Sequence, residues 1–144
     1  MKVNPIPEGY HTITPYLVVK NVDEIMSFLK KAFGAVGTVC HSDDQGAAHC
    51  EMKVGNSMVM IGRAKDESQI TKSMLYLYVE NTDEWYKKAV SAGAVSILEP
   101  MDQFYGDRNA GVEDPNGNQW WLATRIEELT PEELKKRSEA CSCC

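Results

Sequence analysis

The feature that most constrains the fold of this chain is an internal repeat. Residues 16–24 (YLVVKNVDE) return 60 residues later as residues 76–84 (YLYVENTDE). The triplet that begins at Gly34 returns 59 residues later, and Glu51, Gly55 and Asn56 return 62 residues later as Glu113, Gly117 and Asn118. Repeats of this length are whole supersecondary units that need a neighbour to cover their apolar face. The sequence therefore predicts two similar modules that fold together.

Length and composition agree with a single domain. A chain of 144 residues, 43% of them hydrophobic, can bury a substantial core. We therefore expect one domain over residues 1–144, with a first repeat at 10–62, a second at 73–125, and a helix with a cysteine-rich tail at 126–144.

Charge and hydropathy narrow the class of partner. The net charge of −6, with acidic and basic residues interspersed, argues against a nucleic-acid partner and against an anionic membrane surface. No apolar stretch is long enough for a signal peptide or a membrane span, so a cytoplasmic location is expected.

The five cysteines do not suggest a disulfide framework, because their number is odd. Three of them, Cys141, Cys143 and Cys144, crowd the C-terminus and could capture a soft metal ion. No histidine or fourth cysteine nearby completes a zinc pattern there. The simpler alternative is a frayed chain end.

Each repeat has the local pattern βαβββ. A strand is expected at 13–20. Asn21 and Glu24 then cap a helix, and Gly34 ends it. The apolar face of this helix consists of Ile25, Leu29, Ala32 and Phe33. Asn81, Glu84, Trp85, Ala89 and Gly93 repeat this design. Further strands are expected at 36–41, 48–53, 58–62, 95–100, 108–113 and 119–124. Thr130, Pro131 and Glu133 open a short last helix.

Two such units in tandem, with these anchors, resemble the vicinal oxygen chelate superfamily, the glyoxalase, bleomycin-resistance and extradiol-dioxygenase group. The segments 14–17 (TPYL), 102–108 (DQFYGDR) and 114–121 (DPNGNQWW) are similar to its PhnB-like branch. The resemblance implies an α+β fold in which two βαβββ modules form a cup-shaped curved mixed sheet with helices outside. It also implies a small-molecule ligand in the cup and a homodimer.

In metal-using members of the superfamily, four inward positions carry His or Glu and hold a divalent cation. The corresponding residues here are Thr14, Val59, Met74 and Trp121. None is a good ligand for such an ion. The resemblance therefore implies that the usual metal site is absent, and no cofactor is expected. The branch often has His after the second turn glycine, where this chain has Asn118.

If those positions point into the cup, strand alternation places other side chains there. Tyr16 and Val18 accompany Thr14, and Tyr76 and Tyr78 accompany Met74, whereas Leu17, Val19, Leu77 and Val79 face the helices. An aromatic face with phenolic hydroxyls suits a small-molecule pocket. Ordinary half-buried sheet tyrosines are the alternative.

A second polar group could hold a metal. Residues 43–47 (DDQGA) suit a three-residue hairpin loop, which places Cys40 opposite Cys50 and His41 opposite His49. His41, His49 and Glu51 then converge on the face of Val59, where they could bind a divalent ion or line a ligand site, with Glu51 as a candidate general base. The two cysteines would lie on the opposite face as core residues.

The segment 102–108 holds Tyr105 and Arg108 near the rim of the cup. Arg108 could bind a carboxylate or phosphate of a ligand. Equally, it could pair with Asp102, Asp107 or Glu113 and fix the loop.

Three functions remain open. The first is binding of a small molecule in the cup without the usual metal, with a ligand site of Thr14, Tyr16, His49, Glu51, Met74, Tyr76, Tyr78, Tyr105, Arg108 and Trp121. The second is a lyase, isomerase or dioxygenase that uses His41, His49 and Glu51. The third is a purely structural role in assembly. No catalytic triad or phosphate-binding loop is present.

Overall fold

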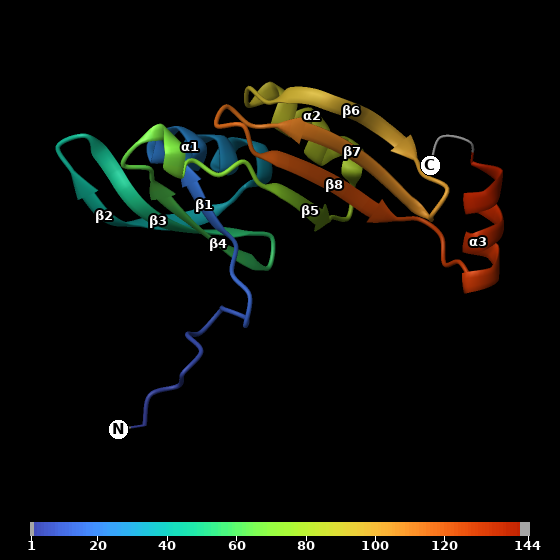
Figure 1. Cartoon of the computed structure of the whole chain (residues 1–144), viewed down its shortest axis with the longest axis horizontal. Coiled ribbons are helices and arrows are strands. Elements are labelled where there is room, and N and C mark those ends of the chain that lie inside the picture. Colours follow the sequence, from blue (N-terminus) through green and yellow to red (C-terminus); the bar gives the residue numbers. More distant parts are fainter. Residues whose placement is uncertain (1, 142–144) are drawn as a thin grey trace.

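The computed structural model describes residues 2–141, and its elements follow the repeated order that the sequence predicts (Figure 1). The first module consists of β1 (Tyr16–Val19), α1 (Val22–Phe33), β2 (Val36–Asp43), β3 (Gly46–Val54) and β4 (Ser57–Arg63). The second consists of β5 (Met74–Tyr78), α2 (Thr82–Ser91), β6 (Val95–Asp102), β7 (Asp107–Glu113) and β8 (Gln119–Arg125). A 3-10 turn, η1 (Glu67–Gln69), lies between the modules, and α3 (Pro131–Ala140) follows the second. The predicted α+β class and the βαβββ order are confirmed.

Each module forms its own mixed four-stranded sheet. The strand orders are β1-β4-β3-β2 and β5-β8-β7-β6, with the first strand parallel to the last and the other pairs antiparallel. The sheets lie side by side (Figure 1), and β1 and β5 are both edge strands. Over the part of the chain that is described, no backbone pairing joins the two sheets into one.

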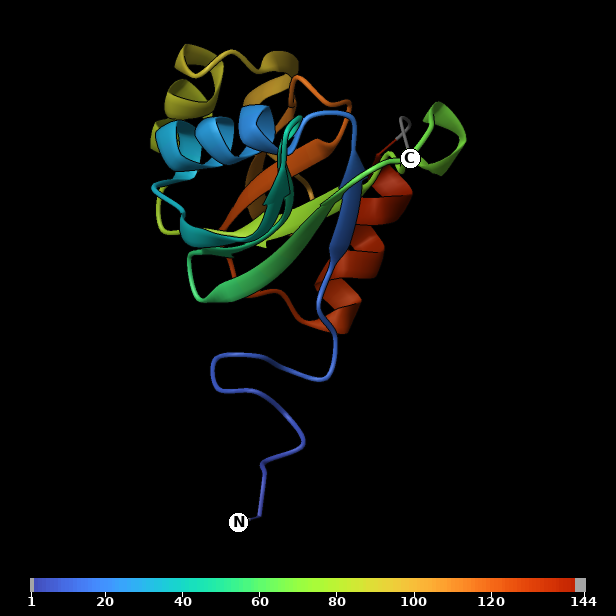
Figure 2. The ribbon, with the colours of Figure 1, turned by 90° about the vertical axis from the view of Figure 1, so that its left-hand side faces the viewer.

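Both helices begin after their predicted asparagine caps and α1 ends at Gly34 as predicted, whereas α2 ends at Ser91 with Ala92 as its C-cap, one residue before the predicted Gly93. The Asn21 side chain accepts a hydrogen bond from the Glu24 amide at 3.0 Å, and Asn81 does the same for Glu84 at 3.1 Å. Gly34 ends α1 in the left-handed conformation, with φ 62°. Both helices cover the same side of the sheets (Figure 2). We call this the helix side, and the opposite surface of each sheet its open face.

One hydrophobic core joins the modules. Leu17 and Val19 of β1 and Ile25 and Leu29 of α1 are essentially fully buried in it, as strand alternation and helical spacing predict. Phe33, at the end of α1, packs against two residues of the second module. Its ring centroid lies 5.2 Å from that of Trp85 and 5.5 Å from that of Trp120. The modules therefore share an aromatic contact at their junction.

The prediction that Val59 shares a face with His49 and Glu51 is wrong. Val59 is 4% exposed and belongs to the helix-side core, whereas Met60 pairs with Glu51 and faces the other way. The error comes from the unequal lengths of the β3–β4 and β7–β8 turns. Lys53 pairs with Met58 in the first module and Glu113 with Gln119 in the second, so the second turn is one residue longer. The counterpart of Trp121 is therefore Met60.

The C-terminal helix packs at the outer end of the second module (Figure 1). Arg137 of α3 donates to Glu127 at 2.8 Å and to the Phe104 carbonyl at 3.3 Å. Cys143 and Cys144, named in the tail hypothesis, lie outside the described residues, and Cys141 is half-buried. None of the helices within residues 2–141 is long and apolar enough to cross a bilayer.

Candidate functional site

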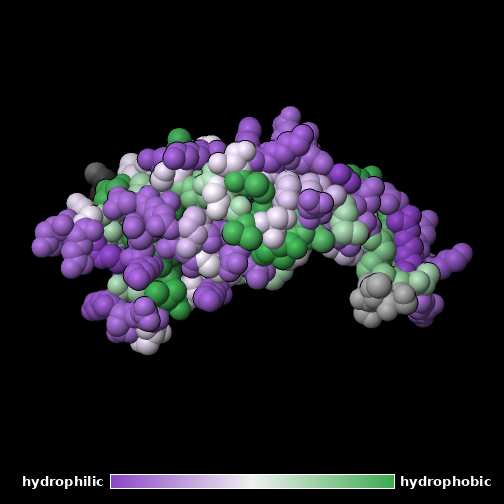
Figure 3. All heavy atoms as spheres, turned by 90° about the horizontal axis from the view of Figure 1, so that it is seen from above, coloured by the Kyte–Doolittle hydropathy of each residue, from purple (hydrophilic) through white to green (hydrophobic). Residues whose placement is uncertain are grey.

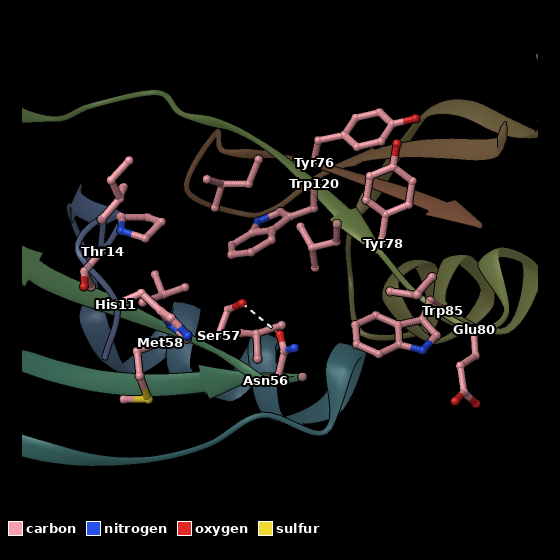
Figure 4. Close-up of a pocket in the computed structure, with 18 residues that line it drawn as sticks. His11, Thr14, Asn56, Ser57, Met58, Tyr76, Tyr78, Glu80, Trp85 and Trp120 are labelled. Carbon is pink, nitrogen blue, oxygen red and sulfur yellow. Dashed lines mark hydrogen bonds between the residues drawn. The ribbon is translucent and has the colours of Figure 1, made fainter. Parts of the chain in front are cut away.

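A cavity of about 610 Å³ lies between the two modules (Figure 4). Its apolar wall comes from both modules: Val54, Met58 and Val59 of the β3–β4 hairpin, Leu75 and Leu77 of β5, Val79 just after β5, Trp85 of α2 and Trp120 of β8. The two indoles point into the space in Figure 4. This volume and this aromatic, aliphatic lining are typical of small-molecule sites. In a space-filling view, apolar surface gathers near the middle of the elongated molecule, while its β2 end is mostly polar (Figure 3).

A few polar groups border the cavity. The β3–β4 turn contributes Asn56 and Ser57, whose side chains hydrogen-bond to each other at 3.0 Å. The segment before β1 contributes His11 and Thr14, and the connection between β5 and α2 contributes Glu80. These groups can orient a ligand that the apolar wall holds. Of the predicted ligand-site residues, Thr14, Tyr76 and Tyr78 line this cavity, and the others lie elsewhere.

The cavity exists because the two helices cover their first strands unequally. In the first module, Leu17 and Val19 are 1% and 0% exposed beneath α1. Their counterparts Leu77 and Val79 are only half-buried and contribute to the cavity wall. The second helix is shorter than α1, and only Thr82 and Ala89 of it are buried. The sequence did not indicate this difference, because the repeated strands read alike.

Tyrosine hydroxyls form a network on the open face of the second module. Tyr76 and Tyr78 both donate to the same oxygen of the buried Asp107, at 2.8 and 3.1 Å. The Asn109 amide donates to the hydroxyls of Tyr76, at 3.2 Å, and Tyr105, at 2.7 Å. Burial raises the pKa of Tyr76, and the hydrogen bond to Asp107 raises that of Tyr78. The sequence predicted the tyrosines on this face, but it indicated Asp107 only as a partner of Arg108 and gave no signal for Asn109.

The open face of the first module carries a related pair. The Tyr16 hydroxyl lies 3.2 Å from Nδ1 of His49, and the two rings stack with centroids 5.6 Å apart. Tyr76 and Asn109 are 60 residues further along and form the equivalent contact. Gly62 makes room for this pair, since a Cβ atom there would lie 2.5 Å from the Tyr16 hydroxyl. The internal symmetry therefore extends to polar contacts.

The position of Cys40 differs from the prediction. His41 does pair with His49, but Cys50 pairs with Val39, because a β-bulge leaves Cys40 as an extra residue in β2. The predicted three-residue loop is also shorter, with Asp43 paired to Gly46. Cys50 is buried in the core as expected, whereas Cys40 is exposed.

The bulge changes which side chains converge. A sulfur, nitrogen or oxygen ligand atom from each of Cys40, His49 and Glu51 lies within 4.8 Å of the other two. His41 is not part of this group in the described chain. The predicted set of His41, His49 and Glu51 is thus replaced by one in which the cysteine takes the place of His41.

The positions that hold a metal in metal-using relatives do not fit one here. Thr14 lines the inter-module cavity, and Met74 is 63% exposed on β5. The Trp121 indole donates its N–H to Gln119 at 3.1 Å and has no lone pair to offer a metal. With Met60 in place of Val59, no imidazole or carboxylate occupies any of the four positions.

Arg108 forms ion pairs that fix its loop, which is the alternative to ligand binding that the sequence left open. Its guanidinium pairs with both carboxylate oxygens of Asp83, at the start of α2, at 2.8 and 2.9 Å. It also pairs with Asp102 at 3.0 Å. These two aspartates raise the pKa of Arg108, and Arg108 lowers that of Asp83. The side chain thus ties the β6–β7 loop to α2.

Similarity to known proteins identifies the family of this chain. An uncharacterized protein of Mycobacterium bovis is 29% identical over 136 residues, which cover 85% of this chain and 89% of that protein. Among solved structures, TioX from Micromonospora sp. ML1 is similar with a TM-score of 0.69 and 20% identity, over 81% of this chain and 99% of that one.

A glyoxalase/bleomycin resistance protein/dioxygenase family enzyme from Burkholderia phytofirmans PsJN has a TM-score of 0.64 and 17% identity, over 77% of this chain and 95% of that one. The likeness to these solved structures concerns the fold. Residues 9–122 match the family model described as Glyoxalase/Bleomycin resistance protein/Dioxygenase superfamily. With its paired βαβββ modules, the chain belongs to this superfamily.

Proposed function

We propose that the protein is a PhnB-like member of its superfamily that binds a small, mainly apolar molecule between its two modules, without a metal at the inherited positions. The observation that carries this proposal is the cavity of about 610 Å³, with its two indoles and the aliphatic side chains of Leu75, Leu77 and Val79. Burial of apolar ligand surface against this wall would drive binding, and Thr14, Asn56 and Ser57 would orient the ligand.

The phenols at the edge of the cavity have a more limited role than the sequence suggests. The rings of Tyr76 and Tyr78 border the cavity, but their hydroxyls are held by Asp107. In this proposal the rings provide contact area, and polar recognition depends on the first module. A suitable ligand is therefore aromatic or aliphatic with one or two hydrogen-bonding groups.

The proposal includes a single domain that acts as a homodimer in the cytoplasm. Both open faces expose large side chains, among them Tyr16, Met74 and Tyr78 at 50%, 63% and 68%, and both β1 and β5 have an unpaired edge. A second copy of the chain would cover these three side chains and the β1 and β5 edges. Light scattering coupled to size-exclusion chromatography should give twice the monomer mass, and Met74→Lys should lower it.

A thermal-shift screen with amphipathic aromatic compounds tests the ligand site. A compound that binds only the native protein raises its melting temperature. Leu77→Trp fills the cavity and should abolish that rise. Ile97→Trp is the matched control, because Ile97 is exposed on β6 and does not line the cavity. Equal shifts in both variants would contradict the cavity site, as would the absence of any stabilising compound.

A further inference from the structure

We propose that Cys40, His49 and Glu51 form a binding site for a thiophilic divalent cation of the zinc type on the open face of the first module. None of the three residues lines the inter-module cavity. The site is therefore independent of the proposed ligand function. It also differs from the positions that carry the metal in metal-using relatives.

The geometry is close to that of a three-ligand zinc site. The sulfur, one imidazole nitrogen and one carboxylate oxygen lie within 4.8 Å of one another. In a tetrahedral zinc site such atoms are about 3.5 Å apart, since metal–ligand bonds measure about 2.0–2.3 Å. Cys40 is exposed, and the one hydrogen bond that its thiol makes within the described residues is a long contact of 3.9 Å with the Thr38 carbonyl. Small side-chain rotations are therefore enough to close the group around an ion.

The bulge in β2 is what makes the set possible. In a regular antiparallel ladder, a residue between two that face one side points to the other side. The extra residue at Cys40 breaks this alternation between Val39 and His41. The thiol therefore joins two side chains of β3 that already share a face, His49 and Glu51, which pair with Gly62 and Met60 of β4.

Two tyrosines support the three ligands. The Tyr16 hydroxyl holds Nδ1 of His49 at 3.2 Å, so Nε2 is available to a metal. The Tyr10 hydroxyl is buried beside the Glu51 carboxylate. A neutral phenol in this place can donate to the second oxygen of a metal-bound carboxylate.

Charge and ligand type select the kind of cation. No Lys or Arg in the described chain forms an ion pair with Glu51. With Cys40 as thiolate and His49 neutral, the site carries two negative charges, which a divalent ion neutralises. Sulfur and nitrogen ligands favour zinc over Mg²⁺ and Ca²⁺, which prefer oxygen. On binding, the thiol loses its proton to the buffer as the metal–sulfur bond forms.

Titration of the full-length protein with Co²⁺ and Zn²⁺ tests the site. We expect one Co²⁺ per chain, a thiolate-to-cobalt charge-transfer band in the near ultraviolet, and displacement of Co²⁺ by Zn²⁺ but not by Mg²⁺. Calorimetry in buffers of different ionisation enthalpy should detect one proton released per ion. Absence of the band, or displacement by Mg²⁺, would overturn the proposal.

Substitutions identify the ligands. Cys40→Ser should abolish the charge-transfer band, and Glu51→Gln should weaken binding by at least about 100-fold, since even loss of an outer-shell partner costs roughly 10–100-fold. Glu113→Gln, the same change in the second module, should have no effect. His41→Ala and a triple Ser substitution of Cys141, Cys143 and Cys144 should also leave binding unchanged. Loss of binding in either of these would assign the metal to the alternative histidine set or to the tail.

Discussion

Phe33 offers a direct test of how the two modules are joined. It is the last residue of α1, it is 7% exposed, and its ring packs on Trp85 and Trp120 of the second module as well as on Phe28, at a centroid distance of 5.7 Å. Removal of a buried phenylalanine side chain costs about 3–5 kcal/mol. We therefore expect Phe33→Ala to lower the free energy of unfolding by about that amount.

A matched pair of substitutions separates aromatic contact from simple burial. Phe33→Leu keeps most of the apolar volume but loses three ring pairs, each worth about 0.5–1.5 kcal/mol, so we expect a loss of about 1.5–4.5 kcal/mol. Phe28→Leu loses one such pair, and it should cost less.

Urea unfolding, followed by both tryptophan fluorescence and far-ultraviolet circular dichroism, measures these values. The two signals should coincide in the wild type, because a shared core unfolds as one unit. Separate transitions in the wild type, or an equal cost for the two leucine variants, would refute the inference that Phe33 couples the modules.

Three further predictions concern single contacts. Burial raises the pKa of the Asp114 carboxyl above its ordinary 3.8, so ionisation of this group favours the unfolded state. The free energy of unfolding should therefore fall as pH rises from 3.8 through the raised pKa. Asp114→Asn should remove this fall in urea titrations at a series of pH values, and it should cost about 1–3 kcal/mol for the lost acceptor. Gly62→Ala should displace the Tyr16 ring at a cost of about 1–3 kcal/mol, and unchanged His49 imidazole resonances in NMR spectra would contradict this. Arg108→Gln should speed proteolysis at residues 102–107 without changing ligand affinity, and a loss of affinity would instead make the guanidinium a ligand contact.

The order of elements could be read from the sequence because each depends on local physics. Asn21 and Asn81 cap helices through their own side chains, and Gly34 takes a conformation that other residues rarely adopt. The inward-facing Leu17 and Val19 follow from alternation along a strand. The repeat indicated the remaining strands and their order, since a pattern that occurs twice is strong evidence for a module.

The candidate sites were less accessible, because each depends on a shift of one residue or on tertiary packing. A single extra residue in the second turn moved the inherited metal position from Val59 to Met60. The bulge at Cys40 has no signature in the sequence. The inter-module cavity depends on how far a helix covers a strand. Two strands with the same alternating pattern can therefore be covered to different extents.

That unequal coverage gives the duplicated halves different freedom to change. In the first copy, a substitution at Leu17 or Val19 falls in the sealed interior, so selection for folding will restrict it. In the second, Leu77 and Val79 border open space, and side chains of other sizes can be accommodated there. One half of the gene can thus preserve the architecture while its twin diversifies towards new chemical targets.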